Sequence, residues 1–183
     1  MKQKAEKKSL YNYCLYISSI RLTYMSLETD IKQTKFRSPF QKLYLNLIYT
    51  SNCILYHQLD LFRSAGLSTQ QYNVLRILRG QAGKPIKLND ISCRMLDKTS
   101  NVSRLVDKLL EKGLLDRTVC PGNRRAVNVT ITKEGLDVLA KLDPEVEAWE
   151  ESFSVFTLDQ ANQLNDWLDQ LRTIVRKGLE PVV

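Results

Sequence analysis

The fold of this chain is decided by residues 84–132, KPIKLNDISCRMLDKTSNVSRLVDKLLEKGLLDRTVCPGNRRAVNVTIT, which predict two short helices followed by a β-hairpin. In the middle of this stretch, apolar residues recur at the three- and four-residue spacing of one helix face and stop at Gly113. The residues of this face, which we expect to point inward, are Val102, Leu105, Val106, Leu109 and Leu110. A shorter stripe precedes it, formed by Leu88, Ile91 and Met95. Between the stripes, Asp97 or Thr99 can cap the second helix, so the pattern predicts a helix-turn-helix.

The residues after Gly113 predict a hairpin, because the apolar period changes from that of a helix to that of a strand. Val127, Val129 and Ile131 alternate with small or polar residues. Residues 114–120 supply the partner strand across a loop that contains Pro121, Gly122, Asn123, Arg124 and Arg125. A hairpin with two arginines at its tip is typical of a wing.

The outer face of the second helix carries hydroxyl, amide and cationic groups, which suit phosphate oxygens and the base edges of a major groove. The residues that we expect to contact double-stranded DNA there are Lys98, Thr99, Ser100, Asn101, Ser103, Arg104 and Lys108. Arg104 and Lys108 are like charges four residues apart, which costs an isolated helix about 0.2–0.5 kcal/mol, and an anionic partner would offset that repulsion. At the hairpin tip, Arg124 and Arg125 suit a narrow minor groove. The alternative for both sets is an ordinary solvated polar surface.

Three segments in this part of the chain together resemble a known family. They are residues 105–117 (LVDKLLEKGLLDR), 123–127 (NRRAV) and 131–135 (ITKEG), and they look like the winged-helix core of the multiple antibiotic resistance regulator (MarR) family. The resemblance covers roughly residues 38–177. It implies a mainly α-helical fold with a small β-hairpin wing, that is, a winged helix-turn-helix joined to a helical dimerisation region.

The resemblance also implies roles for particular residues. Arg125 matches the wing arginine of the family, and we expect Asp107, Arg117 and Asn123 to support the wing, with Arg117 paired to Asp107. Asn123 stands where the family usually has an aspartate, so it can form a hydrogen bond but no ion pair. The family further implies a homodimer that binds a pseudo-palindromic operator. It also implies a small, often phenolic ligand that binds between the dimer helices and the DNA lobe.

Helix-start patterns flank this core on both sides. Ser38-Pro39-Phe40-Gln41 predicts a long helix up to Gly66, residues 68–71 repeat the capping pattern for a helix ending near Gly80, and residues 157–160 repeat it for the last helix. We therefore expect an N-terminal extension at 1–37, a first dimerisation helix at 38–66, a winged-helix DNA-binding lobe at 67–132 and C-terminal dimerisation helices at 133–183. The alternative is that these helices only close a monomeric core.

Behind the wing, Thr132 is expected to start a helix that turns Leu136, Leu139 and Leu142 inward. Asp143-Pro144 should either kink this helix or begin a new segment.

Charge and composition favour a DNA-binding protein over an enzyme. The net charge is +7, and residues 84–125 contribute +5 whereas residues 126–183 contribute −6. The sequence offers no phosphate-cradling glycine loop and no recognisable nucleophile with a neighbouring base, so we expect no enzymatic activity and no cofactor. The competing class is a winged-helix module that binds protein.

The remaining features concern cysteines, location and the N-terminus. Cys14, Cys53, Cys93 and Cys120 lack metal-site spacing, and we expect reduced, buried thiols in a cytoplasmic protein, none of them a dedicated oxidant sensor. The single histidine, His57, is expected at the surface or at an interface. No apolar stretch approaches a membrane span. Residues 1–24 are either a basic arm or an extension upstream of an alternative start at Met25. We favour the second of these alternatives.

Overall fold

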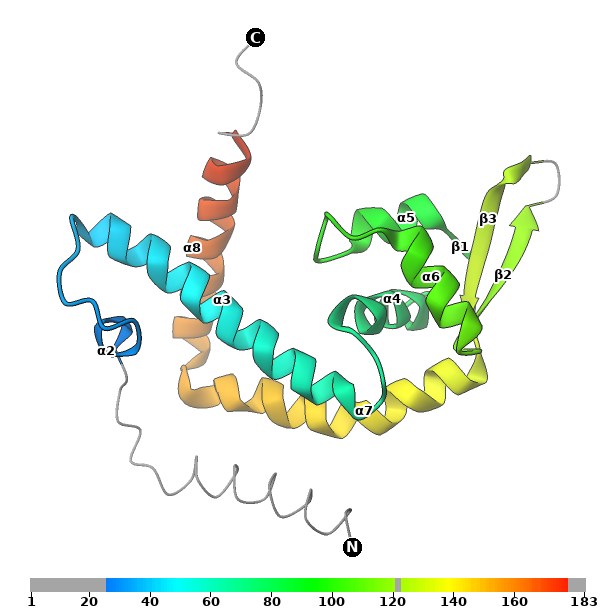
Figure 1. Cartoon of the computed structure of the whole chain (residues 1–183), viewed down its shortest axis with the longest axis horizontal. Helices are drawn as coiled ribbons and strands as arrows, with labels where there is room; N and C mark the ends of the chain where they lie inside the picture. The colour runs from blue at the N-terminus through cyan, green and yellow to red at the C-terminus, as the bar shows by residue number, and fades with distance from the viewer. Residues whose placement is uncertain (1–25, 121–122, 178–183) are drawn as a thin grey trace, which may run out of the picture. The chain divides into compact units, whose positions relative to one another are not determined.

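The computed structural model describes the backbone of residues 26–120 and 123–177, and the side chains of residues 26–119 and 127–176. The expectations for residues 1–24 and for Cys14 lie outside these residues. The elements, coloured along the chain in Figure 1, are α2 (Leu27–Asp30), α3 (Pro39–Arg63), α4 (Thr69–Arg79), β1 (Ile86–Lys87), α5 (Leu88–Arg94), α6 (Val102–Glu111), β2 (Leu115–Cys120), β3 (Asn123–Ile131), α7 (Lys133–Glu151), the 3₁₀ turn η1 (Ser152–Val155) and α8 (Leu158–Lys177). The predicted fold class, mainly helical with a small antiparallel sheet, is confirmed.

The chain divides into two compact units, residues 1–54 and 55–183, whose boundary falls within α3. In the first unit, the start of α3 is capped as predicted, because the Gln41 amide donates to Ser38 Oγ at 3.2 Å. The Gln41 side chain in turn accepts from the backbone amide of Arg37 at 2.6 Å. Glu28 on α2 pairs with Lys42 on α3 at 2.5 Å, and this ion pair ties α2 to the beginning of α3.

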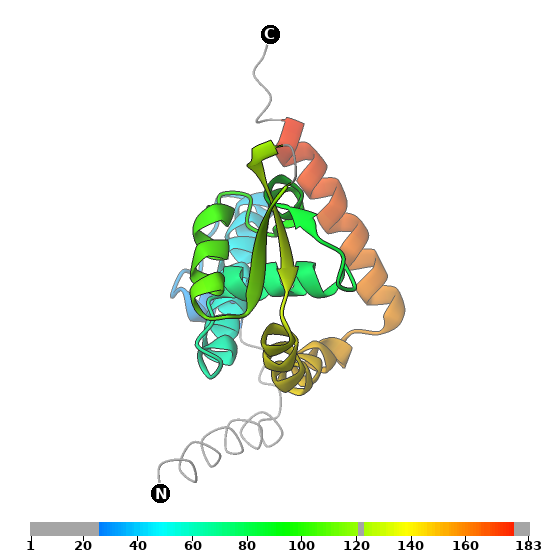
Figure 2. The ribbon, with the colours of Figure 1, turned by 90° about the vertical axis from the view of Figure 1, so that its right-hand side faces the viewer.

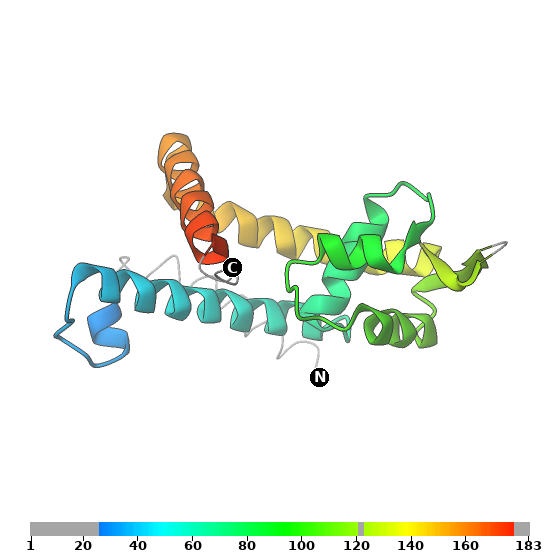
Figure 3. The same cartoon turned by 90° about the horizontal axis from the view of Figure 1, so that it is seen from above.

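The second unit contains a three-stranded antiparallel sheet with strand order β1-β3-β2 (Figure 2). The sequence predicted the β2–β3 hairpin but missed β1, which pairs Ile86 with Val129. A strand of two residues has too little alternation to be recognised from its pattern. The hairpin projects beyond the helices of this unit (Figure 3), as a wing does. Its loop is shorter than predicted, because β3 begins at Asn123, so Arg124 and Arg125 belong to a strand and not to the loop.

The core of the second unit joins the sheet to α4, α6 and α7. Its fully buried side chains come from all of these elements and include Val74, Leu75, Val106, Leu109, Leu115, Val129 and Leu139. Each such side chain contributes about 1.5–3 kcal/mol by leaving water. The part of α7 up to Val146 therefore belongs to this core, through Leu139, Leu142 and Val146.

Two leucines that were predicted to point inward are exposed, namely Leu110 at 39% and Leu136 at 40%. On α7 the inward position at the first turn is taken by Gly135, since a Cβ there would lie 2.2 Å from the carbonyl oxygen of Leu114. The next residue is rotated away by about 100° on a helix, and Leu139 and Leu142 return to the core. On α6 the inward positions are Val102, Val106 and Leu109, which leaves Leu110 at the edge.

The Asp143-Pro144 pair does not begin a new segment, because α7 continues through Pro144 to Glu151. The predicted start of this helix is confirmed, with the Gly135 amide donating to Thr132 Oγ1 at 3.1 Å. The last capping box is also present, since the Thr157 amide donates to the Gln160 side chain at 2.9 Å. Among the helices in the described ranges, none has both the length and the apolar character needed to cross a membrane.

Candidate nucleic-acid interface

The turn between α5 and α6 is closed by Asp97. Asp97 Oδ1 accepts hydrogen bonds from the backbone amide and the hydroxyl of Thr99, at 2.9 and 2.7 Å. These two bonds, the hydroxyl first, hold the pKa of Asp97 below its usual value, so the carboxylate is ionised at neutral pH. The prediction that Asp97 or Thr99 caps the second helix is wrong. The cap is Asn101, whose Oδ1 accepts from the Arg104 amide at 3.1 Å, because α6 begins only at Val102.

Several side chains that were predicted to contact DNA therefore have structural partners. Lys98 Nζ donates to the carbonyl oxygen of Cys93 at 2.6 Å, in the last turn of α5. Thr99 is bound by Asp97, and Asn101 caps α6. The Ser100 hydroxyl oxygen is buried and has no hydrogen-bond partner among the described residues. Lys98, Thr99 and Ser100 precede the helix, so they belong to the turn and not to α6.

The outer face of α6 presents Ser103, Arg104 and Lys108, and all three are exposed. Neither cation forms an ion pair within the described part of the chain. Arg76, Arg79 and Arg117, in contrast, all lie within 4.0 Å of an aspartate. Two like charges at helical spacing, neither of them in an ion pair among the described residues, leave a site for an external anion.

A pocket of about 260 Å³ lies beside this face. It brings Gln70, from the first turn of α4, together with Asp97 of the turn and with Arg104 and Lys108 of α6. The sequence reasoning missed Gln70 and Asp97 as site residues. Gln70 lies within the capping pattern of α4, and that pattern says nothing about which distant helix its side chain approaches.

The base of the hairpin is fastened to α6 and α7. Arg117 Nη1 on β2 donates to Asp107 Oδ1 on α6 at 2.8 Å, so the predicted pairing of these two residues is present. Thr132 Oγ1 donates to the carbonyl oxygen of Gly113 at 2.8 Å, and the Thr132 amide donates to that of Leu114 at 3.3 Å. The described backbone places Asn123, Arg124 and Arg125 at the start of β3, and their side chains lie outside the description.

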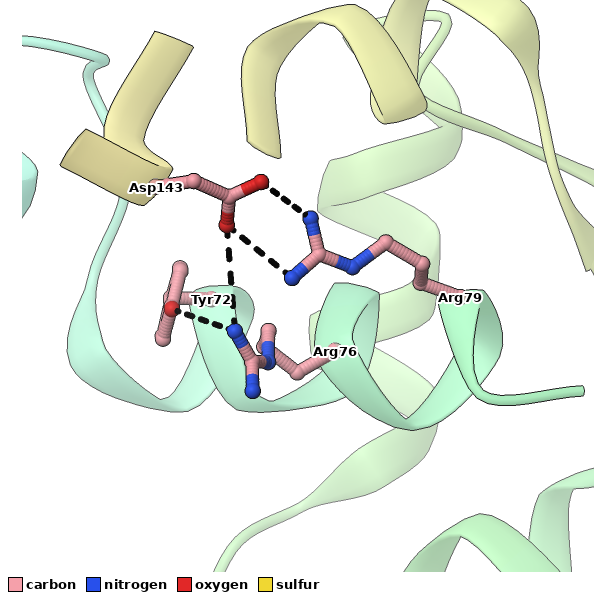
Figure 4. A network of polar contacts seen from close by, with 4 residues as sticks. All are labelled: Tyr72, Arg76, Arg79 and Asp143. Carbon is pink, nitrogen blue, oxygen red and sulfur yellow. Dashed lines mark hydrogen bonds and ion pairs between the residues drawn. The ribbon is translucent and has the colours of Figure 1, made fainter. Parts of the chain in front are cut away.

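A second polar cluster joins α4 to α7 (Figure 4). Arg79 donates two hydrogen bonds to Asp143, and Arg76 lies 3.8 Å from the same carboxylate and 3.5 Å from the hydroxyl of Tyr72. The hydrogen bonds from Arg79 lower the pKa of Asp143. Two arginines thus share one carboxylate, and Arg76 keeps most of its hydrogen-bonding capacity.

His57 on α3 is half-buried and stacks on Trp149 of α7, with ring centroids 3.7 Å apart. Burial lowers its pKa, so the ring is neutral at pH 7, and its Nδ1 has no partner among the described residues.

The expectation of buried thiols is wrong for two cysteines, because Cys53 and Cys93 are both exposed.

A helix-turn-helix that is followed by a projecting antiparallel hairpin, with unpaired cations on the exposed face of its second helix, defines a winged-helix DNA-binding fold. The comparisons with known proteins narrow the class. The model of the MarR family matches residues 67–127. The crystal structure of a MarR transcription factor from Planctomyces limnophilus is 32% identical, with a TM-score of 0.57, and the match covers 78% of this chain and 96% of that chain.

The chain therefore belongs to the MarR family of winged-helix transcriptional regulators, as the resemblance predicted, and it is a DNA-binding regulator and not an enzyme. The transcriptional repressor MprA of Escherichia coli (strain K12) is 24% identical over 161 residues, with 82% of this chain and 88% of MprA covered. The structure of Sco3205 from Streptomyces coelicolor, a MarR family regulator in complex with DNA, is 23% identical with a TM-score of 0.63, covering 81% of this chain and 93% of that one.

Proposed function

We propose that the protein is a homodimeric repressor that binds a pseudo-palindromic operator in the cytoplasm and is released from it by a small ligand. The observation that carries this proposal is the pair of exposed cations on α6, Arg104 and Lys108, which form no ion pair within the described residues. An α-helix fits the major groove, where an arginine can contact guanine through two hydrogen bonds. Relatives with repressor names, MprA and IacR of Pseudomonas putida, support the direction of regulation.

The residues divide into two roles in this proposal. Ser103, Arg104 and Lys108 contact the DNA from α6, and Arg124 and Arg125 enter the minor groove from the wing. The other residues of the predicted interface act mainly by holding these in place: Lys98, Thr99, Ser100 and Asn101 in the turn, and Asp107, Arg117 and Asn123 at the wing. The backbone amides of Thr99 and Ser100 already donate to Asp97, so they also hold the turn in place.

Exposed apolar faces support the homodimer. On α3 the exposed fractions are 80% for Phe40 and 62% for Tyr44, and on α8 they are 58% for Trp167 and 67% for Ile174. Apolar side chains of this size, repeated along two helices, are expected to be covered by another surface. We assign 38–66 and 133–183 to dimerisation and 67–132 to DNA binding, with the part of α7 up to Val146 shared between the two. A second copy covers both faces in an isologous contact.

For the ligand, we propose an aromatic molecule with an acidic group, bound by Arg76 and Tyr72. Arg76 is 43% exposed, and at 3.8 Å from Asp143 its guanidinium can turn to a new carboxylate or phenolate. Two structures with the same fold contain such molecules: the regulator RdhR-CbdbA1625 with 2,4-dichlorophenol, at 16% identity, and NadR with 4-hydroxyphenylacetate, at 19% identity. A ligand there would pull Arg76 away from Asp143 and so change the junction between α4 and α7.

The test starts from a preferred duplex selected from random sequences, and measures affinity for it and for a scrambled duplex. We expect two half-sites about 34–36 Å apart. A plot of the logarithm of the binding constant against the logarithm of the salt concentration should have a slope of about −0.9 for each phosphate that the protein neutralises. Arg104→Ala should lower affinity by about 1–3 kcal/mol and relax the preference, whereas Arg172→Ala on α8 should change neither. The competing function, a protein-binding winged helix, predicts no sequence preference and no salt slope.

A further inference from the structure

The 260 Å³ pocket beside α6 is lined in part by Gln70 of α4, a helix outside the helix-turn-helix formed by α5 and α6. The first turn of α4 is capped by Ser68 and Gln71. The Ser68 amide donates to Gln71 Oε1 at 3.0 Å, and the Gln71 amide donates to Ser68 Oγ at 3.1 Å. Gln70 takes no part in this exchange. Its side chain is half-buried and lines the pocket, where it lies beside the carboxylate of Asp97 and helps to lower the pKa of that group.

The charges around the pocket suit a monoanion. Arg104 and Lys108 provide two positive charges and Asp97 one negative charge, which leaves a local charge of +1. Each phosphodiester of DNA carries a single negative charge. The carboxylate of Asp97 has one oxygen, Oδ1, occupied by the amide and the hydroxyl of Thr99, and the two cations of α6 outweigh its charge.

The hydrogen-bonding groups are mostly donors. The guanidinium of Arg104 and the ammonium of Lys108 donate only, and the Gln70 amide has two N–H groups. The hydroxyl of Ser100, which is buried without a partner among the described residues, adds another donor at the pocket wall. Phosphate oxygens are acceptors, so this wall is complementary to them.

We propose that this pocket receives one backbone phosphate of the bound duplex, and that Gln70 donates a hydrogen bond to it beside Arg104 and Lys108. The inference rests on the proposed function and adds a residue of α4 to the DNA interface. A phosphate held between α4 and α6 positions α6 in the major groove, but it reads no base.

The test compares Gln70→Met with Gln81→Met in the full-length protein. Methionine keeps the length of the side chain and removes the amide. Gln81, two residues beyond the end of α4, donates to the carbonyl of Ile77 and is not among the residues that line the pocket. Gln70→Met should weaken binding about fivefold to tenfold, equally for preferred and scrambled duplexes. The salt slope should stay unchanged, because glutamine is neutral, whereas Lys108→Ala should lower the slope by about 0.9. Gln81→Met should bind as the wild type does.

Gln70→Glu provides a second arm, because it has nearly the same shape and replaces the amide with an anion. It should weaken binding more than Gln70→Met, with a thermal midpoint close to that of the wild type. A loss confined to the preferred duplex would assign Gln70 to a base edge and overturn the phosphate contact, as would unchanged affinity in both variants. Wild-type protein without salt-dependent binding would refute the proposed function and this inference together, whereas normal wild-type binding with a silent Gln70→Met refutes the inference alone.

Discussion

Arg79 and Asp143 form a two-pronged ion pair between the end of α4 and the middle of α7, with N–O distances of 2.7 and 3.0 Å (Figure 4). The two residues are 64 positions apart, so the pair fastens two distant segments. Both side chains are about one-third exposed, at 30% and 29%. Solvent therefore reduces the energy of the pair, but its two parallel hydrogen bonds give it a defined geometry.

Asp143→Asn should destabilise the protein by about 0.5–1.5 kcal/mol at pH 7, measured by urea unfolding. The pKa of Asp143 is lowered in the folded protein, so its contribution is present above the pKa of the unfolded chain and is lost as the pH falls through the folded value. The difference between wild type and variant should accordingly shrink below about pH 4. Asp169→Asn is the control, because its pair with Arg172 is more than half exposed. A difference that persists at low pH would contradict the assignment to this carboxylate.

Gly135→Ala should destabilise the protein by at least about 2 kcal/mol. The added Cβ would lie 2.2 Å from the carbonyl oxygen of Leu114, and this oxygen belongs to the backbone, which moves less easily than a side chain. Gly80→Ala is the matched control. It places Cβ no closer than 3.5 Å to any atom, at an ordinary helical φ of −64°, and should be neutral or slightly stabilising. Thermal or urea unfolding of both variants measures this. Equal stability of the two would show that α7 can retreat from Leu114.

Asn101 separates a structural from a direct role in DNA binding. Asn101→Ala removes the cap of α6 and should lower stability by about 0.5–2 kcal/mol, whereas Asn101→Ser should restore most of it. If Asn101 acts only as a cap, the serine variant should bind DNA as the wild type does. Full stability combined with a persistent binding defect in the serine variant would instead place the amide of Asn101 on the DNA.

The exposed thiols of Cys53 and Cys93 can be tested for a sensing role. Neither lies in a cluster that would form an intramolecular disulfide within the described residues, so we expect peroxide to leave DNA affinity unchanged. Affinity is measured before and after peroxide treatment, in the wild type and in Cys53→Ser and Cys93→Ser. Loss of binding that one of these single substitutions abolishes would overturn this prediction.

Local patterns in the sequence determined the elements, because each pattern acts over a few residues. The apolar period from Val102 to Leu109 predicted α6, and the alternation at Val127 to Ile131 predicted β3. The capping residues Ser68 and Thr132 predicted where α4 and α7 begin to within one residue. They do so because the oxygen of a capping side chain must accept a hydrogen bond from the backbone amide two or three residues later in the chain. The same local logic predicted the exposed cations of α6 and the family to which the chain belongs.

The tertiary structure decided which polar groups remain available to a partner. Lys98, Thr99 and Asn101 looked equivalent to Arg104 in the sequence, yet their side chains bind Cys93, Asp97 and the first turn of α6. Only the packing of α4 against α6 brings Gln70 to Arg104 and Lys108, across more than thirty positions. Contacts at such separations depend on how several helices pack around one core, and no local period records that packing.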